Sequence, residues 1–274
     1  MDKTILITGG NSGIGKATAI ALAKTGANVI IGCRDEKKGK AAVEEIKKAS
    51  GNNKIELLII DLASQKSVRA AVEEFRKKHD RLHVLINNAA VFLSKREETE
   101  DGLEKTFETN YLSHFLLTHL LLDTLKASAP ARIVNVASKH GGIKINFDDL
   151  QTKQNYSFMK AVGPTKLGMI MFTKELAKKL EGKGVTVNSL HPGLAKSNIL
   201  NDMSGFVKFI FGMMSSSPEK CAETSIYLAT SPEVEKVSGK YFEKKKEKPT
   251  GSNANNETDI KRLWDVSMKL AKLE

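Results

Sequence analysis

TILITGGNSGIG, residues 4–15, begins as a β-branched run, passes through glycines and leads into the helix-favouring sequence KATAIALA at residues 16–23. A strand that turns through glycines into a helix gathers backbone N–H groups and the positive end of the helix dipole at one point. Such a point favours a pyrophosphate, and the position of the glycines between strand and helix makes the motif specific. The stretch therefore predicts a dinucleotide site.

The residues of this turn have separate expected roles. Gly9 permits the tight turn, Gly13 allows the phosphate to approach closely, and Gly15 allows the helix to pack on the strand. Three further residues of the turn are assigned to the same cofactor loop: Asn11, Ser12 and Ile14.

Composition and charge narrow the class of protein. The chain has 41% hydrophobic and 27% charged residues, which is ordinary for a soluble globular protein. No apolar run approaches the ~20 residues of a membrane span, and a first strand by residue 4 leaves no room for a signal peptide. Cys33 and Cys221 are too few for a disulfide framework. We therefore expect a cytoplasmic location and no metal centre.

The net charge of +11 could reflect a solvated surface, attraction to an anionic membrane or binding to nucleic acid. The lysines are interleaved with glutamates on expected helix faces, and aromatic residues make up only 6% of the chain. This pattern favours a solvated surface and excludes nucleic acid as the expected partner. Peripheral attraction to an anionic membrane surface stays open as the alternative.

Strand-like and helical runs alternate almost throughout the chain, which predicts one α/β domain with a parallel, doubly wound Rossmann-type sheet of about seven strands and helices on both faces. The expected strands are Thr4–Thr8, Asn28–Cys33, Ile55–Ile60, Val84–Asn87, Arg132–Ala137, Val185–Leu190 and Gly239–Phe242. The expected helices are 14–25, 36–50, 65–79, 101–126, 166–181, 218–230 and 256–273. Residues 1–245 would form the dinucleotide-binding domain. Residues 246–274 would add a C-terminal loop and a helix packed on the same domain. The lysine run 244–248 leads into residues 249–253, which are expected to form a loop.

Ligands of such a sheet bind beyond the carboxyl ends of its strands, so the residues after each strand are candidate contacts. Arg34 follows the second strand, where an arginine favours a 2′-phosphate. NADP(H) is therefore the preferred cofactor, NAD(H) remains possible, and Arg34 as a mere surface charge is the alternative. Asp61 and Leu62 follow the third strand and face the expected adenine. Asn88 and Ala89 follow the fourth and face the expected ribose.

Three motifs occur in order along the chain: TGxxxGIG at residues 8–15, NNAA at 87–90, and Pro192-Gly193. Together they resemble the short-chain dehydrogenase/reductase family over about residues 4–245. The local runs ATA (17–19), FDDL (147–150), FTKELA (172–177) and TSIYLA (224–229) resemble its retinol-dehydrogenase-like branch. That branch handles lipophilic alcohols and carbonyl compounds, and the resemblance also implies a homodimer.

The resemblance implies an active site of Asn110, Ser138, a tyrosine and Lys166, with Pro192 and Gly193 on the nicotinamide side. The residues also have chemical interpretations of their own. Ser138 ends the fifth expected strand, so its hydroxyl would point into the ligand crevice. Lys166 heads an expected helix, where an ammonium group is unfavourable for the dipole. Asn110 would hold a water or a backbone group. A plain turn serine and a solvated lysine are the alternatives.

One departure from the family concerns the proton donor. The family has a tyrosine four residues before the lysine, and here that position is Val162, which has no proton to give. Tyr156 and Lys160 have the same spacing, but Gly163-Pro164 follows them, and proline is tolerated only in the first turn of a helix. We therefore expect the helix to begin near Pro164 and Tyr156 to lie in the preceding loop.

Three hypotheses about function follow. The chain is a slow oxidoreductase with a substitute acid, namely Tyr156, His140, or a water held by Ser138 and Lys166. Alternatively it binds NADP(H) and an apolar ligand without turnover, or it uses the fold only as a scaffold. The intact glycine motif argues against the scaffold, and the oxidoreductase is the leading hypothesis. The apolar run Phe206–Met214 is either a buried core helix or a lid over a lipophilic substrate that also touches a membrane.

Overall fold

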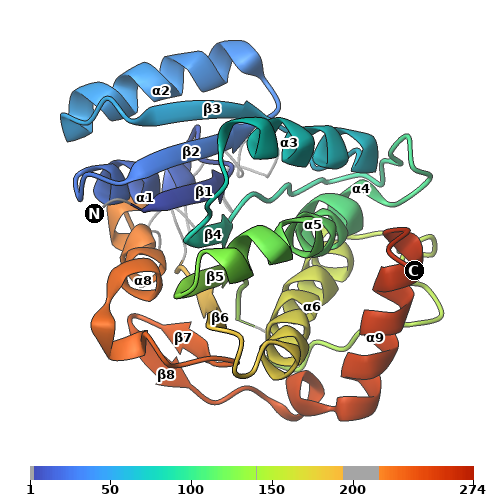
Figure 1. Ribbon diagram of the computed structural model, residues 1–274. Coiled ribbons are helices and arrows are strands. Elements are labelled where there is room, and N and C mark those ends of the chain that lie inside the picture. Colours follow the sequence, from blue (N-terminus) through green and yellow to red (C-terminus); the bar gives the residue numbers. More distant parts are fainter. Residues whose placement is uncertain (1–2, 140, 194–215) are drawn as a thin grey trace.

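The computed structural model describes residues 3–139, 141–193 and 216–274. Within these residues one sheet has the strand order β3-β2-β1-β4-β5-β6-β7-β8, and every pair is parallel except the last, β7 with β8 (Figure 1). The order reverses between β1 and β4, which is the switch point where a doubly wound sheet opens a ligand crevice. The predicted α/β fold is confirmed.

The strands are β1 Thr4–Thr8, β2 Asn28–Cys33, β3 Ile55–Ile59, β4 Val84–Asn87, β5 Ala131–Val136, β6 Val185–His191, β7 Tyr241–Glu243 and β8 Lys246–Lys248. The helices are α1 Gly13–Ala23, α2 Glu36–Ser50, α3 Gln65–Lys78, α4 Lys105–Phe107, α5 Ser113–Ala127, α6 Phe158–Lys179, α8 Pro218–Thr230 and α9 Glu257–Leu270. A π-helical turn, η1 Glu108–Leu112, joins α4 to α5, and short 3-10 turns lie at η3 Pro232–Val234 and η4 Ser252–Asn255.

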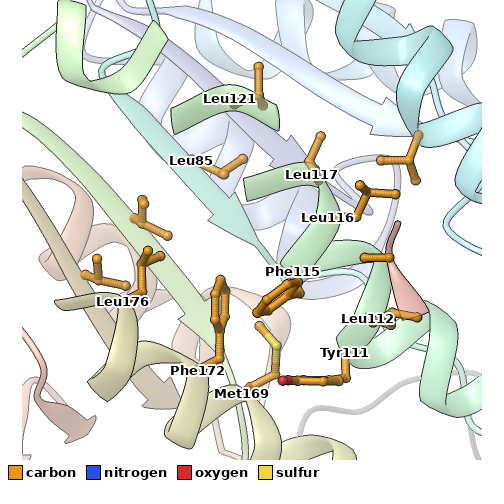
Figure 2. Packing of buried hydrophobic residues seen from close by; sticks show 14 of the residues in the cluster. Leu85, Tyr111, Leu112, Phe115, Leu116, Leu117, Leu121, Met169, Phe172 and Leu176 are labelled. Atoms are coloured by element: carbon orange, nitrogen blue, oxygen red, sulfur yellow. The ribbon is translucent and has the colours of Figure 1, made fainter. Parts of the chain in front are cut away.

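The sheet is buried on both faces, because alternate side chains of each central strand enter different cores. Ile5 and Ile7 of β1 pack in the core formed with α1, α2 and α8. Leu6, between them, packs in the second core, which α3, α5, α6 and α9 complete. Figure 2 shows this second core, where Phe115 of α5 faces Phe172 of α6 with ring centroids 5.0 Å apart.

The prediction that the helix expected at residues 166–181 begins near Pro164 is wrong. α6 begins at Phe158, Ser157 caps it by accepting a hydrogen bond from the Lys160 backbone N–H, and Pro164 lies inside it. Proline removes one helical hydrogen bond, but the residues beside Pro164 are buried in the tertiary structure. Gly163, for example, lies against the side chain of Ile143. Packing therefore outweighs the local preference, and Tyr156 precedes the helix as expected.

The segment expected as a C-terminal loop from residue 246 begins instead with a strand. Lys246–Lys248 form β8, which pairs antiparallel with β7. The two turn residues, Lys244 and Lys245, have φ values of 48° and 62°. Such left-handed turn positions usually hold asparagine or glycine, so the sequence gives no turn signal here.

The C-terminal helix α9 lies against α6 (Figure 1). Trp264 of α9 packs edge-on against Phe115 of α5, with ring centroids 5.2 Å apart, and Lys179 of α6 lies 4.7 Å from the centre of the tryptophan ring. Side chains of α3 hold the end of α9: Arg69 donates to the Ala271 carbonyl at 2.7 Å. No helix in the described part of the chain is long and apolar enough to span a membrane.

Candidate functional site

A cleft of about 900 Å³ opens at the carboxyl ends of the strands, and its size is typical of a small-molecule or cofactor site. It brings together most of the residues singled out in the sequence: Gly9, Asn11, Ser12, Gly13, Ile14, Gly15, Arg34, Asp61, Leu62, Asn88, Ala89, Ser138, Val162, Lys166, Pro192 and Gly193. Asn110 and Tyr156 are the two predicted site residues, among those described, that do not line it.

The glycine turn has the geometry that each expected role requires. Gly9 has a φ of +67°, the left-handed conformation of a tight turn. A Cβ on Gly15 would collide with the Gly9 carbonyl oxygen and lie 2.7 Å from the Asn88 amide nitrogen, so only glycine allows this packing. A Cβ on Gly13 would meet no atom within 4 Å, because this residue faces the open cleft. That open space fits the close approach of a phosphate.

The N-terminus of α1 meets the cleft without a side-chain cap. The side chain of Ser12, at the N-cap, accepts no hydrogen bond from the helix, whereas the side chains of Asp35 and Ser64 cap α2 and α3. Because the first N–H groups of a helix need acceptors and carry the positive end of its dipole, this terminus favours an anion. The turn thus fits the pyrophosphate of a dinucleotide.

Thr8 joins the glycine turn to the loop after β4. Its hydroxyl oxygen accepts hydrogen bonds from the backbone N–H groups of Asn88 and Ala89 at 2.9 Å and 3.0 Å. The Asn88 amide in turn donates to the Thr8 carbonyl at 2.8 Å. These bonds fix the two loops on either side of the switch point and explain why the two motifs occur together.

Three cations line the cleft at the ends of β1 and β2: Lys16, Arg34 and Lys38. Lys16 forms an ion pair of 2.6 Å with Glu45, and Lys38 lies 3.8 Å from an Asp35 oxygen. Arg34 is exposed and, within the described residues, has no ion pair. Sequence reasoning found Arg34 but missed the two lysines, although their places just after a glycine turn and just after Asp35 were available signals.

Ser138, Val162 and Lys166 meet at the other end of the cleft, where β5, β6 and α6 converge. Lys166 is 5% exposed and donates to the Val136 carbonyl at 3.1 Å. Burial lowers the pKa of its ammonium group to about 8. Val162 lies one helical turn earlier on the same helix and presents an apolar side chain to the cleft.

Asn110 lies in the π-helical turn η1 and acts on the backbone rather than on the cleft. Its Oδ1 accepts a hydrogen bond from the Val91 N–H at 2.7 Å, and its Nδ2 donates to the Val91 carbonyl at 2.9 Å. Val91 itself lines the cleft. Asn110 therefore holds one wall of the site in place, and its assignment to the catalytic group stays a prediction.

Three other expected site features lie away from the cleft or beyond the described residues. The Tyr156 hydroxyl donates to the Leu93 carbonyl at 3.1 Å, and burial raises its pKa. His140 and the apolar run Phe206–Met214 lie outside the described residues.

His191 is a cleft residue that sequence reasoning missed. It ends β6, lines the cleft, and its Nδ1 is buried without a hydrogen-bond partner among the described residues. Its position directly before Pro192-Gly193, at the carboxyl end of a strand, was the available signal. Phe92 and Phe158, with ring centroids 5.7 Å apart, add aromatic surface to the same cleft.

The family model of short chain dehydrogenases matches residues 3–205. This chain belongs to the short-chain dehydrogenase family. It is 44% identical over 281 residues to retinol dehydrogenase 13 of Mus musculus, covering 99% of this chain and 84% of that protein. It is 45% identical over 287 residues to retinol dehydrogenase 14 of Homo sapiens, covering 97% and 85%.

Solved structures agree with the family membership. An uncharacterised protein from Mycobacterium paratuberculosis superposes with a TM-score of 0.78 at 30% identity, covering 98% of this chain and 93% of that one. A Pseudomonas aeruginosa protein solved as an NADP active-site complex has a TM-score of 0.72 at 26% identity, covering 88% and 93%. The chain is thus an oxidoreductase of the alcohol/carbonyl class with retinol dehydrogenases among its relatives.

Proposed function

We propose that this short-chain dehydrogenase uses NADP(H) to interconvert a lipophilic alcohol and its carbonyl compound. One observation supports this most: a single cleft joins the uncapped glycine turn to Ser138 and Lys166. When bound there, NADP(H) would supply or accept the hydride. The glycine turn would hold its pyrophosphate, Arg34 its 2′-phosphate, Asp61 and Leu62 its adenine, Asn88 and Ala89 its ribose, and Pro192 and Gly193 its nicotinamide.

Ser138 and Lys166 have distinct parts in this reaction. The Ser138 hydroxyl donates a hydrogen bond to the substrate oxygen and so orients it in the cleft. The Lys166 ammonium group, desolvated beside the Val136 carbonyl, stabilises negative charge that develops on that oxygen. Such stabilisation is stronger in a site from which water is excluded, and Lys166 is buried.

A lipophilic substrate is supported by the chemistry of the cleft walls. Val91 and Phe92, after β4, and Phe158 and Val162, of α6, give the cleft an apolar lining. The relatives named retinol dehydrogenases point in the same direction. A retinoid or another apolar alcohol is therefore the proposed substrate class, while a cytoplasmic location, a homodimer and peripheral membrane contact stay predictions.

Val162 favours a second candidate function. Because no hydroxyl stands at this position of α6, a protein that binds NADP(H) and an apolar ligand without turnover fits the same cleft. The two candidates share their cofactor binding and differ only in turnover.

Fluorescence titration with NADPH and NADH tests the shared part. We expect NADPH to bind more tightly than NADH, and Arg34→Ala to erase the difference because the 2′-phosphate loses its cation. Equal affinities in the unchanged protein would contradict the NADP(H) assignment.

A matched pair of glycine variants tests the pyrophosphate site. Gly13 and Gly51 both have positive φ, and a Cβ on either would meet no atom within 4 Å, but Gly51 ends α2 away from the cleft. Gly13→Val should abolish NADPH binding, whereas Gly51→Val should lower stability and leave binding intact.

Turnover of all-trans-retinal and octanal by the unchanged protein then distinguishes the enzyme from the non-catalytic binder.

A further inference from the structure

We propose that His191 exchanges the proton with the substrate oxygen in this cleft. The inference rests on the proposed function, because an alcohol/carbonyl interconversion must add or remove one proton for each hydride. Val162 has no proton to exchange, and the Tyr156 hydroxyl is bonded to the Leu93 carbonyl and does not line the cleft. The proton must therefore pass through another group.

Few titratable groups line the β5–β6 end of the cleft. Among the described residues there, the side chains that can carry an exchangeable proton are Thr109, Ser138, Lys166, His191 and, at the N-terminus of α8, Glu219. A hydrogen bond from its own backbone N–H holds the pKa of Glu219 below its usual range, so this carboxylate carries no proton near neutral pH. The two hydroxyls orient protons but do not titrate near neutral pH. With a pKa of about 8, Lys166 is mostly a protonated ammonium group at neutral pH, so it does not accept the proton of an alcohol, and one of its N–H groups is held by the Val136 carbonyl. An imidazole exchanges protons near neutrality, and His191 is the imidazole at this end of the described cleft.

The sheet brings His191 close to Ser138. Val136 of β5 pairs with Leu190 of β6, and the Ala137 N–H donates to the Leu190 carbonyl at 2.8 Å. His191 therefore lies beside the Ala137–Ser138 segment on the neighbouring strand, and neighbouring strands are about 4.8 Å apart. A substrate oxygen that is hydrogen-bonded to Ser138 would face both strand ends.

The bonding state of His191 is the second geometric observation. Its Nδ1 is buried and has no partner among the described residues, although a buried polar atom left unpaired normally destabilises the fold. A ligand that bonds to this ring would remove that penalty. By contrast, the other buried histidine of the region, His114, is fully engaged: Nε2 lies 3.0 Å from the Thr8 hydroxyl and Nδ1 3.4 Å from the Asn110 carbonyl.

The surroundings of His191 favour its neutral form. Burial lowers the pKa of the imidazole, Lys139 after β5 acts in the same direction, and Glu243 of β7 opposes them. Lys166 of α6 and Glu219 of α8 line the same cleft. At neutral pH the ring is therefore uncharged, with one nitrogen free to accept a proton.

In alcohol oxidation a bound NADP⁺ would accept the hydride, so the carbinol C–H bond breaks and its electron pair leaves with the hydride. The O–H bond breaks, its proton forms an N–H bond to the His191 ring, and its electron pair becomes the second C–O bond. The imidazolium then releases the proton to solvent. In carbonyl reduction the imidazolium returns this proton to the oxygen.

The sign of the pH dependence follows from this chemistry. Oxidation needs the neutral ring, so its kcat/KM should fall as the pH falls through the His191 pKa, which lies below the usual value. Reduction needs the protonated ring, so its kcat/KM should rise over the same range. A purely structural histidine would not reverse sign between the two directions.

The test compares the unchanged protein with His191→Gln, using retinol and octanol for oxidation and retinal and octanal for reduction. His191→Gln should lower kcat by about 10²-fold or more, with NADPH affinity unchanged. It should also remove the pH dependence of kcat/KM that is due to His191, both for oxidation and for reduction. His79→Gln is the matched control, since His79 pairs with Glu56 and does not line the cleft. Added imidazole should partly restore the rate of His191→Ala.

The remaining outcomes of this test contradict either the role of His191 or the proposed function. Turnover with unaltered rate and pH profile in His191→Gln overturns the role of His191 and leaves the proposed function standing. Loss of NADPH binding in His191→Gln also overturns it, because the residue then supports the cofactor. NADPH binding with no turnover in the unchanged protein overturns the proposed enzymatic function itself, and the role of His191 with it.

Discussion

The side chain of Val162 is 8% exposed and lines the cleft one helical turn before Lys166. A tyrosine placed there would direct its hydroxyl toward the position that Ser138 and Lys166 share. Val162→Tyr should therefore raise kcat for retinal reduction by about 10²-fold, the usual contribution of a positioned acid. Pro164 needs no accompanying change, because residue 162 is already inside α6.

Val162→Phe is the control for this variant, since it adds the same ring without a proton. Equal rates for the tyrosine and phenylalanine variants would show that the added ring acts through packing and would contradict the prediction. In a His191→Gln background, the tyrosine should recover reduction, because it supplies the proton that the imidazole no longer gives.

At the scale of single residues, sequence reasoning succeeds where the cause is local. The roles of Gly9 and Gly15 follow from strand, turn and helix alone, and the structure has the geometry that they need. The partner of Asn110 could not be predicted, because Val91 reaches it only through tertiary folding. The unpaired Nδ1 of His191 is likewise a property of the packed cleft, so no sequence pattern carries it.

Among the elements, α6 makes the sharpest stability prediction. Pro164 removes a hydrogen bond from the interior of this helix, a defect that typically costs about 3 kcal/mol. Pro164→Ala should raise the free energy of unfolding in urea by an amount approaching this, while NADPH affinity stays unchanged. Pro218 is the matched control: it stands in the first turn of α8, where proline fits, so Pro218→Ala should not stabilise the protein. Equal effects of the two substitutions would contradict the argument.

The bounds of the elements were predictable where hydrophobic period and turn chemistry agree. β1, β2 and β4 begin and end at the predicted residues, because buried β-branched runs meet polar or glycine turns at both ends. The start of α6 and the existence of strand β8 could not be predicted from the sequence. In α6, burial of the neighbouring residues overrides the tendency of proline to begin a helix. Before β8, Lys244 and Lys245 adopt a left-handed turn conformation that lysine rarely adopts, so the sequence does not predict the turn.

At the scale of the whole molecule, the assignment of residues 246–274 to the same domain as the rest makes a prediction. Trp264 of α9 is the one tryptophan in the sequence, and it lies against Phe115 and Phe172. If α9 belongs to the cooperative unit, tryptophan fluorescence and far-ultraviolet circular dichroism should change at the same urea concentration. A fluorescence transition at lower urea would show that α9 separates first and would contradict the single unit.

The hydrogen bond from Arg69 to Ala271 joins residues 202 positions apart in the chain. A contact of this sequence separation forms late in folding, since the intervening chain must first be brought together. During synthesis on a ribosome, α5 and α6 emerge well before α9 and have nothing to cover their outer aromatic surface. The nascent chain thus passes through an interval in which Phe115 and Phe172 are open to chaperones or to neighbouring chains, and arrival of the last helix ends that exposure.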